Sequence, residues 1–164
     1  MVLPCIVPLA GSEDMGTGAQ GGTVDLDRPM VEKIIAEAKQ AVRNAYCPYS
    51  RFPVGAAVLT ARGRIFAGCN VENASYGLTV CAERNAVFRM IAEGEREIAA
   101  VAVYTPTAAP AAPCGACRQV IREFGPEAWV ICVCDTDKVI RKRLSELMPL
   151  AFGPEDVSGE GEGG

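Results

Sequence analysis

Three cysteines in this sequence have the side-chain type and the spacing of metal ligands. Cys114 and Cys117 form a C-x-x-C motif, and Cys81 opens a Cys-Ala-Glu-Arg segment further upstream. At the start of a helix, the C-x-x-C spacing places both sulfurs on one side, where they can bind one ion. Three thiolates without an obvious fourth partner indicate a zinc site that keeps one position open to water, as catalytic sites do.

Two neighbours of Cys81 have the chemistry to complete such a site. Glu83 follows closely enough for its carboxylate to stand beside the open position and carry protons between water and a substrate. Arg84 can donate hydrogen bonds to a thiolate. A zinc ion with three thiolates carries a net negative charge, so we expect Arg84 and two helix N-termini to offset it. Taken alone, Glu83 would be an ordinary solvated residue at a helix start.

The full set of cysteines leaves other chemistries open besides an open zinc site. The sequence has eight cysteines and no histidine, which excludes every catalytic triad that needs a histidine. Cys114 and Cys117 alone could form a redox pair, and an even number of cysteines is compatible with a disulfide framework. A closed structural zinc module would need a fourth thiolate from a strand cysteine. We expect the strand cysteines to be small core residues instead, and they are Cys69, Cys132 and Cys134.

Charge and hydropathy exclude several classes of protein. The formal net charge is −4 and the pI is about 5.0, with no basic run beyond residues 141–143, which argues against binding to nucleic acid. Residues 2–10 are apolar, but they contain two prolines and lack the preceding positive charge of a signal peptide. No apolar stretch reaches the roughly 20 residues that cross a bilayer. These features predict a cytoplasmic protein with reduced thiols and no membrane partner.

Several motifs in the same order resemble the zinc-dependent cytidine deaminase family, in its short-chain form with three cysteine ligands. The resemblance covers about residues 30–157. The motifs lie at residues 49–57, 68–77, 81–83, 113–119, 147–149 and 152–154.

The resemblance implies one zinc ion per subunit and Glu83 as the group that transfers protons, as in zinc deaminases generally. It also implies that Arg84 and Gln119 support the ligands without binding the metal. The expected reaction is hydrolytic deamination of cytidine and deoxycytidine to uridine and deoxyuridine with release of ammonia, a step of pyrimidine salvage. Two alternatives stay open: a deaminase of a modified cytosine nucleoside such as blasticidin S, and the structural zinc module with four cysteines. The implied zinc ligands are Cys81, Cys114 and Cys117.

The resemblance also implies a substrate pocket that is shared between subunits of a homotetramer. Asn70 and Glu72 would hydrogen-bond the ribose hydroxyls, which suits an amide beside a carboxylate. Phe52 would lie against the pyrimidine, and the backbone around Ala82 would read the polar edge of the ring. Phe152 would reach into the pocket of a neighbouring subunit. Phenylalanines are nevertheless more often core residues than ligand contacts.

The hydrophobic pattern predicts the elements that must position these residues. Asp27 and Pro29 start a helix whose apolar stripe ends before Pro48, and a later alternation of strands and helices predicts a sheet with helices on both faces. The resemblance implies an α/β, three-layer αβα sandwich with a mixed sheet of about five strands. The expected elements are a hairpin of residues 54–60 and 64–71, helices 81–93 and 115–124, buried strands 98–104 and 129–134, and a strand with a helical turn over 138–147.

Composition divides the chain into three parts. Residues 27–157 are expected to form the catalytic domain. Residues 1–26 are rich in glycine and lack an apolar period, so we expect a flexible leader. Residues 158–164 alternate glycine and glutamate and are expected to form a disordered acidic tail.

Overall fold

A mixed sheet of five strands forms the centre of the structure, a computed structural model that describes residues 26–157. The strand order is β2-β1-β3-β4-β5. β3 pairs with β4 in parallel, and the other neighbouring strands pair antiparallel. The predicted hairpin and both predicted central strands are confirmed. The strands are β1 (Gly55–Thr60), β2 (Ile65–Cys69), β3 (Ile98–Tyr104), β4 (Trp129–Val133) and β5 (Val139–Arg143).

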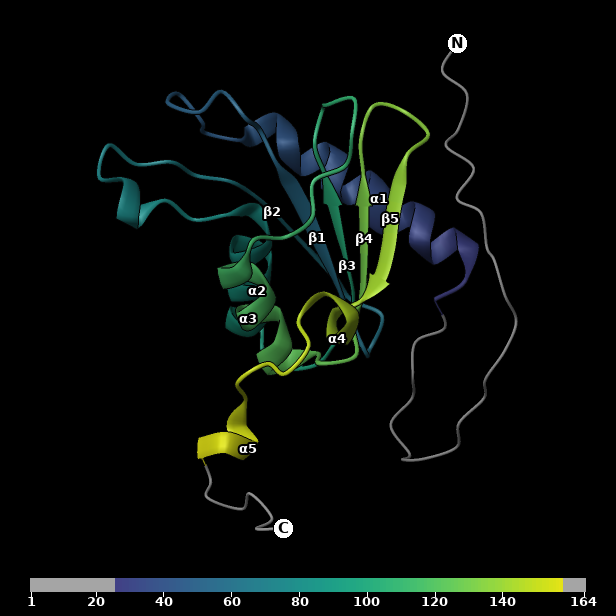
Figure 1. The fold of residues 1–164 in the computed structure, drawn as a ribbon. Coiled ribbons are helices and arrows are strands. Elements are labelled where there is room, and N and C mark those ends of the chain that lie inside the picture. Colours follow the sequence, from purple (N-terminus) through teal and green to yellow (C-terminus); the bar gives the residue numbers. More distant parts are fainter. Residues whose placement is uncertain (1–25, 158–164) are drawn as a thin grey trace.

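Helices cover both faces of this sheet, which confirms the three-layer αβα sandwich (Figure 1). α1 (Arg28–Ala41) lies on one face, and α2 (Ala82–Ala92) and α3 (Gly115–Phe124) lie together on the other. The described part of the chain contains no helix that is both long and apolar enough to span a membrane. The remaining helical segments are the 3-10 turns η1 (Val42–Asn44) and η2 (Tyr76–Leu78) and the short helices α4 (Leu144–Leu147) and α5 (Pro154–Val157).

The start of α1 follows its sequence signals. The Asp27 side chain caps the helix by accepting a hydrogen bond from the Met30 amide over 2.8 Å, and Pro29 lies in the first turn. The predicted stripe faces the sheet, where its buried members are Val31, Ile34 and Ala38. This helix therefore covers the sheet face opposite the cysteines.

Two glycines shape the hairpin that carries the site. Gly63 has a φ of 79° in the turn between β1 and β2, a backbone conformation that residues with a side chain rarely adopt. Gly68 allows α2 to pack directly on β2, because a Cβ there would lie 2.6 Å from the Ala86 amide nitrogen and 2.8 Å from the Ala82 carbonyl oxygen. A second tie joins these elements, since Asn85 Nδ2 donates to the Cys69 carbonyl over 2.8 Å. The N-terminus of α2 is thereby fixed against the sheet.

The C-terminal part of the domain differs from expectation in one place. The strand and helical turn expected over residues 138–147 are present as β5 and α4. The short helix α5 was not expected, and Asp156 caps it by accepting a hydrogen bond from the Gly153 amide over 2.8 Å.

At the N-terminal boundary, Leu26 was assigned to the leader but packs against the core that α1 covers. The rest of the predicted leader and the whole predicted tail lie outside the described residues.

Candidate active site

The three predicted zinc ligands come together at the N-termini of two neighbouring helices. Cys81 is the N-cap of α2 and Cys114 is the N-cap of α3, with Cys117 in the first turn of α3. Their sulfurs all lie within 4.8 Å of one another, and the Cys81 and Cys114 sulfurs are 3.9 Å apart. The prediction that both cysteine motifs open helices is confirmed.

The geometry of this sulfur cluster suits a zinc ion. Zinc–sulfur bonds of about 2.3 Å at tetrahedral angles separate two sulfurs by about 3.8 Å. The Cys81–Cys114 separation of 3.9 Å agrees with that distance and is far longer than a disulfide bond of about 2.05 Å. Within residues 26–157, the cluster contains three cysteines and no fourth. A metal bound here would keep a coordination position that no cysteine of the described chain fills.

The electrostatic surroundings favour thiolates at this point. Two helix N-termini carry partial positive charge toward the cysteines that cap them. Arg84 adds a full charge, because its Nη2 donates to Cys81 Sγ over 3.7 Å and to the Thr79 carbonyl over 3.1 Å. The contact between Arg84 and a ligand sulfur is the one that the sequence predicts.

Without a metal, the cluster already stabilises one thiolate. Hydrogen bonding from Cys117, assisted by Arg84 and Cys114, lowers the pKa of Cys81 to about 5, although burial works in the opposite direction. The pKa of Cys117 is raised, first by its hydrogen bond to Cys81 and then by burial. A bound zinc ion would displace the remaining thiol protons, as it does in other thiolate sites.

Glu83 is a buried carboxyl group beside these sulfurs. It lies in the first turn of α2 and is only 5% exposed, so it is not the solvated residue that a helix start would normally carry. Burial raises the pKa of Glu83 above its ordinary value, and the neighbouring Cys81 charge adds to the effect. Hydrogen bonds from its own backbone and from Cys117 oppose this shift. A carboxyl group with a raised pKa is a stronger base than an ordinary carboxylate, which suits a group that accepts and returns a proton.

The remaining cysteines of the described residues lie outside the sulfur cluster. Cys132 is fully buried in β4, and Cys134 is fully buried just after that strand, as expected of core residues. Cys69 ends β2 and is half-buried, and its pKa is raised by burial. Cys47 lies in the loop after η1 and is half-buried as well. None of them belongs to the sulfur cluster, which removes the expected sources of a fourth thiolate.

The Asn70 side chain binds the backbone of the loop that carries Phe52. Its Nδ2 donates to the Phe52 carbonyl over 2.9 Å, and its Oδ1 accepts from the Val54 amide, also over 2.9 Å. Asn70 is 8% exposed, and Phe52 is 42% exposed. An amide has two N–H donors and an oxygen with two lone pairs, so one donor and one lone pair remain available to a ligand. Asn70 therefore positions the loop, which the sequence did not indicate.

Glu72 holds the same loop from its other end. Its Oε2 accepts hydrogen bonds from the backbone amides of Tyr49 and Ser50 over 2.9 and 3.2 Å. The Ser50 hydroxyl, followed by these two amides, lowers the pKa of the carboxyl group. Glu72 is therefore an ionised group whose orientation is fixed by the loop before any ligand binds.

The predicted residues of α3 and the C-terminal segment are linked to each other. Gln119 Nε2 donates to the Phe152 carbonyl over 3.0 Å, and Phe152 itself is 62% exposed. Arg118 joins the start of α3 to the end of α4, because its guanidinium donates to the carbonyls of Pro113 and Leu147. The Gln119 side chain was expected to support the cysteine ligands, but its hydrogen bond goes to the Phe152 carbonyl and not to a cysteine. Ala82, the first residue of α2, is fully buried.

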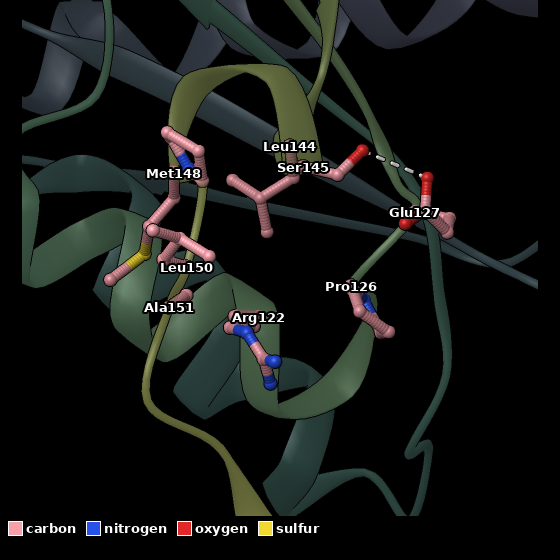
Figure 2. A pocket seen from close by; sticks show the side chains of 9 residues that line it. Arg122, Pro126, Glu127, Leu144, Ser145, Met148, Leu150 and Ala151 are labelled. Carbon is pink, nitrogen blue, oxygen red and sulfur yellow. Dashed lines mark hydrogen bonds between the residues drawn. The ribbon is translucent and has the colours of Figure 1, made fainter. Parts of the chain in front are cut away.

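A separate hollow of about 340 Å³ lies between the end of α3, α4 and the segment that follows α4. Figure 2 shows Met148 and Leu150 on one side of it and Arg122 below. On the other side, the Ser145 hydroxyl donates to Glu127 Oε2 over 2.9 Å. No predicted site residue lines this hollow. It is therefore distinct from the cysteine cluster.

Sequence reasoning missed three residues that shape the site. Ser50 and Arg118 lie within motifs that the sequence displays, but only the fold shows which backbone groups they bind. Gly68 opens another of these motifs, but its importance comes from the close approach of α2, which only the fold shows.

Fold and site together define an α/β protein with a three-cysteine cluster that can hold a metal ion, and comparison with known proteins identifies its family. A family model described as "Cytidine and deoxycytidylate deaminase zinc-binding region" matches residues 29–133. The chain belongs to this family. A cytidine deaminase from Sporosarcina psychrophila is 47% identical over 129 residues, which cover 78% of this chain and 95% of that protein.

Solved structures give the same result. The crystal structure of a cytidine deaminase from Burkholderia pseudomallei matches with a TM-score of 0.70 at 50% identity, covering 73% of this chain and 97% of the other. The structure of a cytidine deaminase from Mycobacterium tuberculosis matches with a TM-score of 0.66 at 42% identity, covering 79% and 99%. The fold and the zinc-binding region are therefore those of this family.

Proposed function

We propose that this chain catalyses the hydrolytic deamination of cytidine and deoxycytidine, giving uridine or deoxyuridine and ammonia. The observation that carries the proposal is the position of Glu83, a buried carboxyl group next to three cysteine sulfurs at two helix N-termini. Relatives at 47% and 48% identity, matched over 95% and 99% of their own lengths, bear the name cytidine deaminase. The balanced reaction consumes one water and releases one ammonia for each cytosine base.

In this proposal, Cys81, Cys114 and Cys117 hold zinc, and Glu83 transfers the protons. Zinc bound to three thiolates supplies a Lewis acid that makes water a better nucleophile. Glu83 takes a proton from the attacking water and gives it to N3 of the ring, which makes C4 more electrophilic. It then takes the remaining proton from the oxygen now bonded to C4 and passes it to the departing amine, so that the C4 carbonyl forms as ammonia leaves. The raised pKa of Glu83 suits both transfers, because it makes the carboxylate a stronger base than an ordinary glutamate.

The substrate contacts are proposed at the loop of residues 49–54 and at the end of β2. Asn70 and Glu72 would bind the ribose hydroxyls with the hydrogen-bonding capacity that the loop leaves free. Phe52 would lie against the pyrimidine, in keeping with its partial exposure. The backbone at Ala82 would read the polar edge of the ring.

We also propose that the enzyme is a homotetramer in which Phe152 enters the pocket of a neighbouring subunit. Phe152 is exposed, and it is anchored through its carbonyl by Gln119, so its ring is free to contact another chain. Large apolar side chains are also exposed around the loop of residues 49–54. Exposed clusters of this kind often mark interfaces between proteins. Those side chains are Tyr46, Tyr49, Val71, Tyr76 and Leu78.

A cytoplasmic role in pyrimidine salvage is consistent with the described cysteines. All of them are free, and three carry the proposed chemistry as thiolates, which requires a reducing compartment. We propose a nucleoside as the partner molecule, with neither nucleic acid nor membrane involved. The acidic net charge of −4 supports the absence of a polyphosphate partner.

A direct assay tests the proposed function. Zinc-loaded protein is mixed with cytidine, deoxycytidine or blasticidin S. Formation of the corresponding uracil compound and release of ammonia are followed in parallel. We expect equal amounts of uracil nucleoside and ammonia from the first two substrates. Turnover of blasticidin S alone would assign the chain to modified nucleosides, and turnover of none would refute the proposal.

A further inference from the structure

The loop of residues 49–54 is held by hydrogen bonds at both ends. Tyr49 and Ser50 donate their backbone amides to Glu72 Oε2 over 2.9 and 3.2 Å. The Phe52 amide instead donates to the Ser50 hydroxyl oxygen over 3.0 Å. The loop therefore has one side chain of its own that takes part in its backbone structure, and that side chain belongs to Ser50.

The Ser50 hydroxyl makes two contacts at once. It accepts from the Phe52 amide over 3.0 Å, while the Ser50 backbone amide donates to Glu72 Oε2 over 3.2 Å. The hydroxyl also lowers the pKa of the Glu72 carboxyl group, as a hydrogen-bond donor close to it would. An ionised carboxylate can only accept, so the Ser50 hydroxyl must donate its hydrogen to Glu72. One donor and two lone pairs allow a hydroxyl to satisfy both partners together. Ser50 is thus the shared partner of the predicted sugar contact and the predicted base contact.

The backbone between these two contacts is in an uncommon conformation. Arg51 has φ of 56°, in the left-handed region, and its amide donates to the Cys47 carbonyl over 3.0 Å. A residue with a side chain is strained in that region and persists there only where the surroundings fix it. Ser50 and Phe52 flank Arg51 in the chain. The hydrogen bond from the Phe52 amide to the Ser50 hydroxyl therefore spans the residue with positive φ.

We propose that Ser50 is a positioning residue that fixes the Phe52 backbone relative to the Glu72 carboxylate, and so sets the distance between base and sugar that the pocket accepts. This inference rests on the proposed function, because it assigns the two contacts to the two parts of a nucleoside. Ser50 itself need not touch the substrate. Its effect is to deliver both contacts already oriented, which lowers the cost of ordering them on binding.

Substitution at Ser50 tests this inference through the kinetic constants. In zinc-loaded protein, we expect Ser50→Ala to raise KM for cytidine about tenfold while kcat stays within about twofold, since the reacting groups at Cys81 and Glu83 are unchanged. Ser50→Thr keeps the hydroxyl and should restore most of the KM. Ser75→Ala is the matched control, since Ser75 is exposed in a nearby loop and engages Asn73 through its backbone amide.

A double-mutant cycle shows whether Ser50 acts through Glu72. In the Glu72→Gln background, we expect Ser50→Ala to change KM by less than about twofold, because the partner it orients is already altered. Independent, multiplicative effects of the two substitutions would overturn the inference. Hydrogen exchange adds a reading that needs no substrate. The Phe52 amide should exchange faster in Ser50→Ala than in the wild type, and equal rates would also overturn it.

The two proposals fail in different ways. If wild-type protein converts no cytosine nucleoside, the proposed function is wrong, and the positioning role falls with it. If the wild type is active and Ser50→Ala behaves like Ser75→Ala, the positioning role alone is wrong.

Discussion

Arg84 donates a hydrogen bond to the sulfur of Cys81 over 3.7 Å, from the first turn of the helix that Cys81 caps. The same guanidinium nitrogen binds the Thr79 carbonyl, so the charge is held in place beside the ligands. A cation at this point favours the thiolate form of Cys81, whose pKa falls to about 5 mainly through hydrogen bonding from Cys117 and also through Arg84. The relationship makes the metal site depend on a residue that does not bind the metal.

Replacing Arg84 should weaken zinc binding. Without its charge, the thiols keep their protons to higher pH, so on acidification zinc is lost at a higher pH than in the wild type. We expect Arg84→Gln to reduce zinc affinity about 10- to 100-fold. Competition with a chelator across a pH series measures both effects. Arg89→Gln, on the exposed side of α2, is the control, and equal zinc affinity and pH dependence in the two variants would contradict the role of Arg84.

Replacing Glu83 should remove proton transfer and spare the metal. Glu83→Gln keeps the size of the side chain but cannot exchange a proton, so turnover of cytidine should fall by at least about 10² to 10⁴. Elemental analysis should still find one zinc per chain. The exposed Glu97 provides a control substitution, Glu97→Gln, that should leave turnover unchanged. Near-normal turnover in Glu83→Gln would refute its role as the proton carrier.

The same substitution has a predicted effect on stability in metal-free protein. Because burial raises the pKa of Glu83 in the fold, the folded protein binds the proton more tightly than the unfolded chain does. Its stability therefore falls as pH rises from the ordinary value of 4.5 through the raised value. Glu83→Gln lacks this loss, so at neutral pH it should unfold at higher urea concentration than the wild type. The difference should vanish below pH 4.5, and its persistence there would contradict the buried carboxyl as its cause.

Gly68 should be essential for placing the first cysteine. A Cβ at this position would lie within 2.8 Å of backbone atoms of α2, which cannot move without shifting the helix that Cys81 caps. Overpacking of this kind costs about 1–3 kcal/mol. We expect Gly68→Ala to lower the free energy of unfolding by that amount and to weaken zinc retention. Gly77→Ala has open space around its Cβ and should do neither, so matching losses in both variants would count against the packing argument.

The sequence predicted the parts of the site that local signals encode. The C-x-x-C motif and the Cys-Ala-Glu-Arg segment both stand at helix starts, and the structure has Cys81 and Cys114 as N-caps. Strand and helix alternation predicted the sheet layers, because apolar periodicity is a local property. The hydrogen bonds of Asn70 to the Phe52 loop could not be predicted, since they join residues that only the folded hairpin brings together. The packing at Gly68 depends on tertiary contact in the same way.

The central claim is that three cysteine sulfurs hold zinc and leave one position for chemistry beside Glu83. X-ray absorption spectroscopy of the zinc-loaded protein tests it most directly, because the scattering distinguishes sulfur from lighter atoms. We predict three sulfur neighbours at about 2.3 Å and one oxygen or nitrogen neighbour at about 2.0 Å. Four sulfur neighbours would mean a closed structural site and would contradict the account.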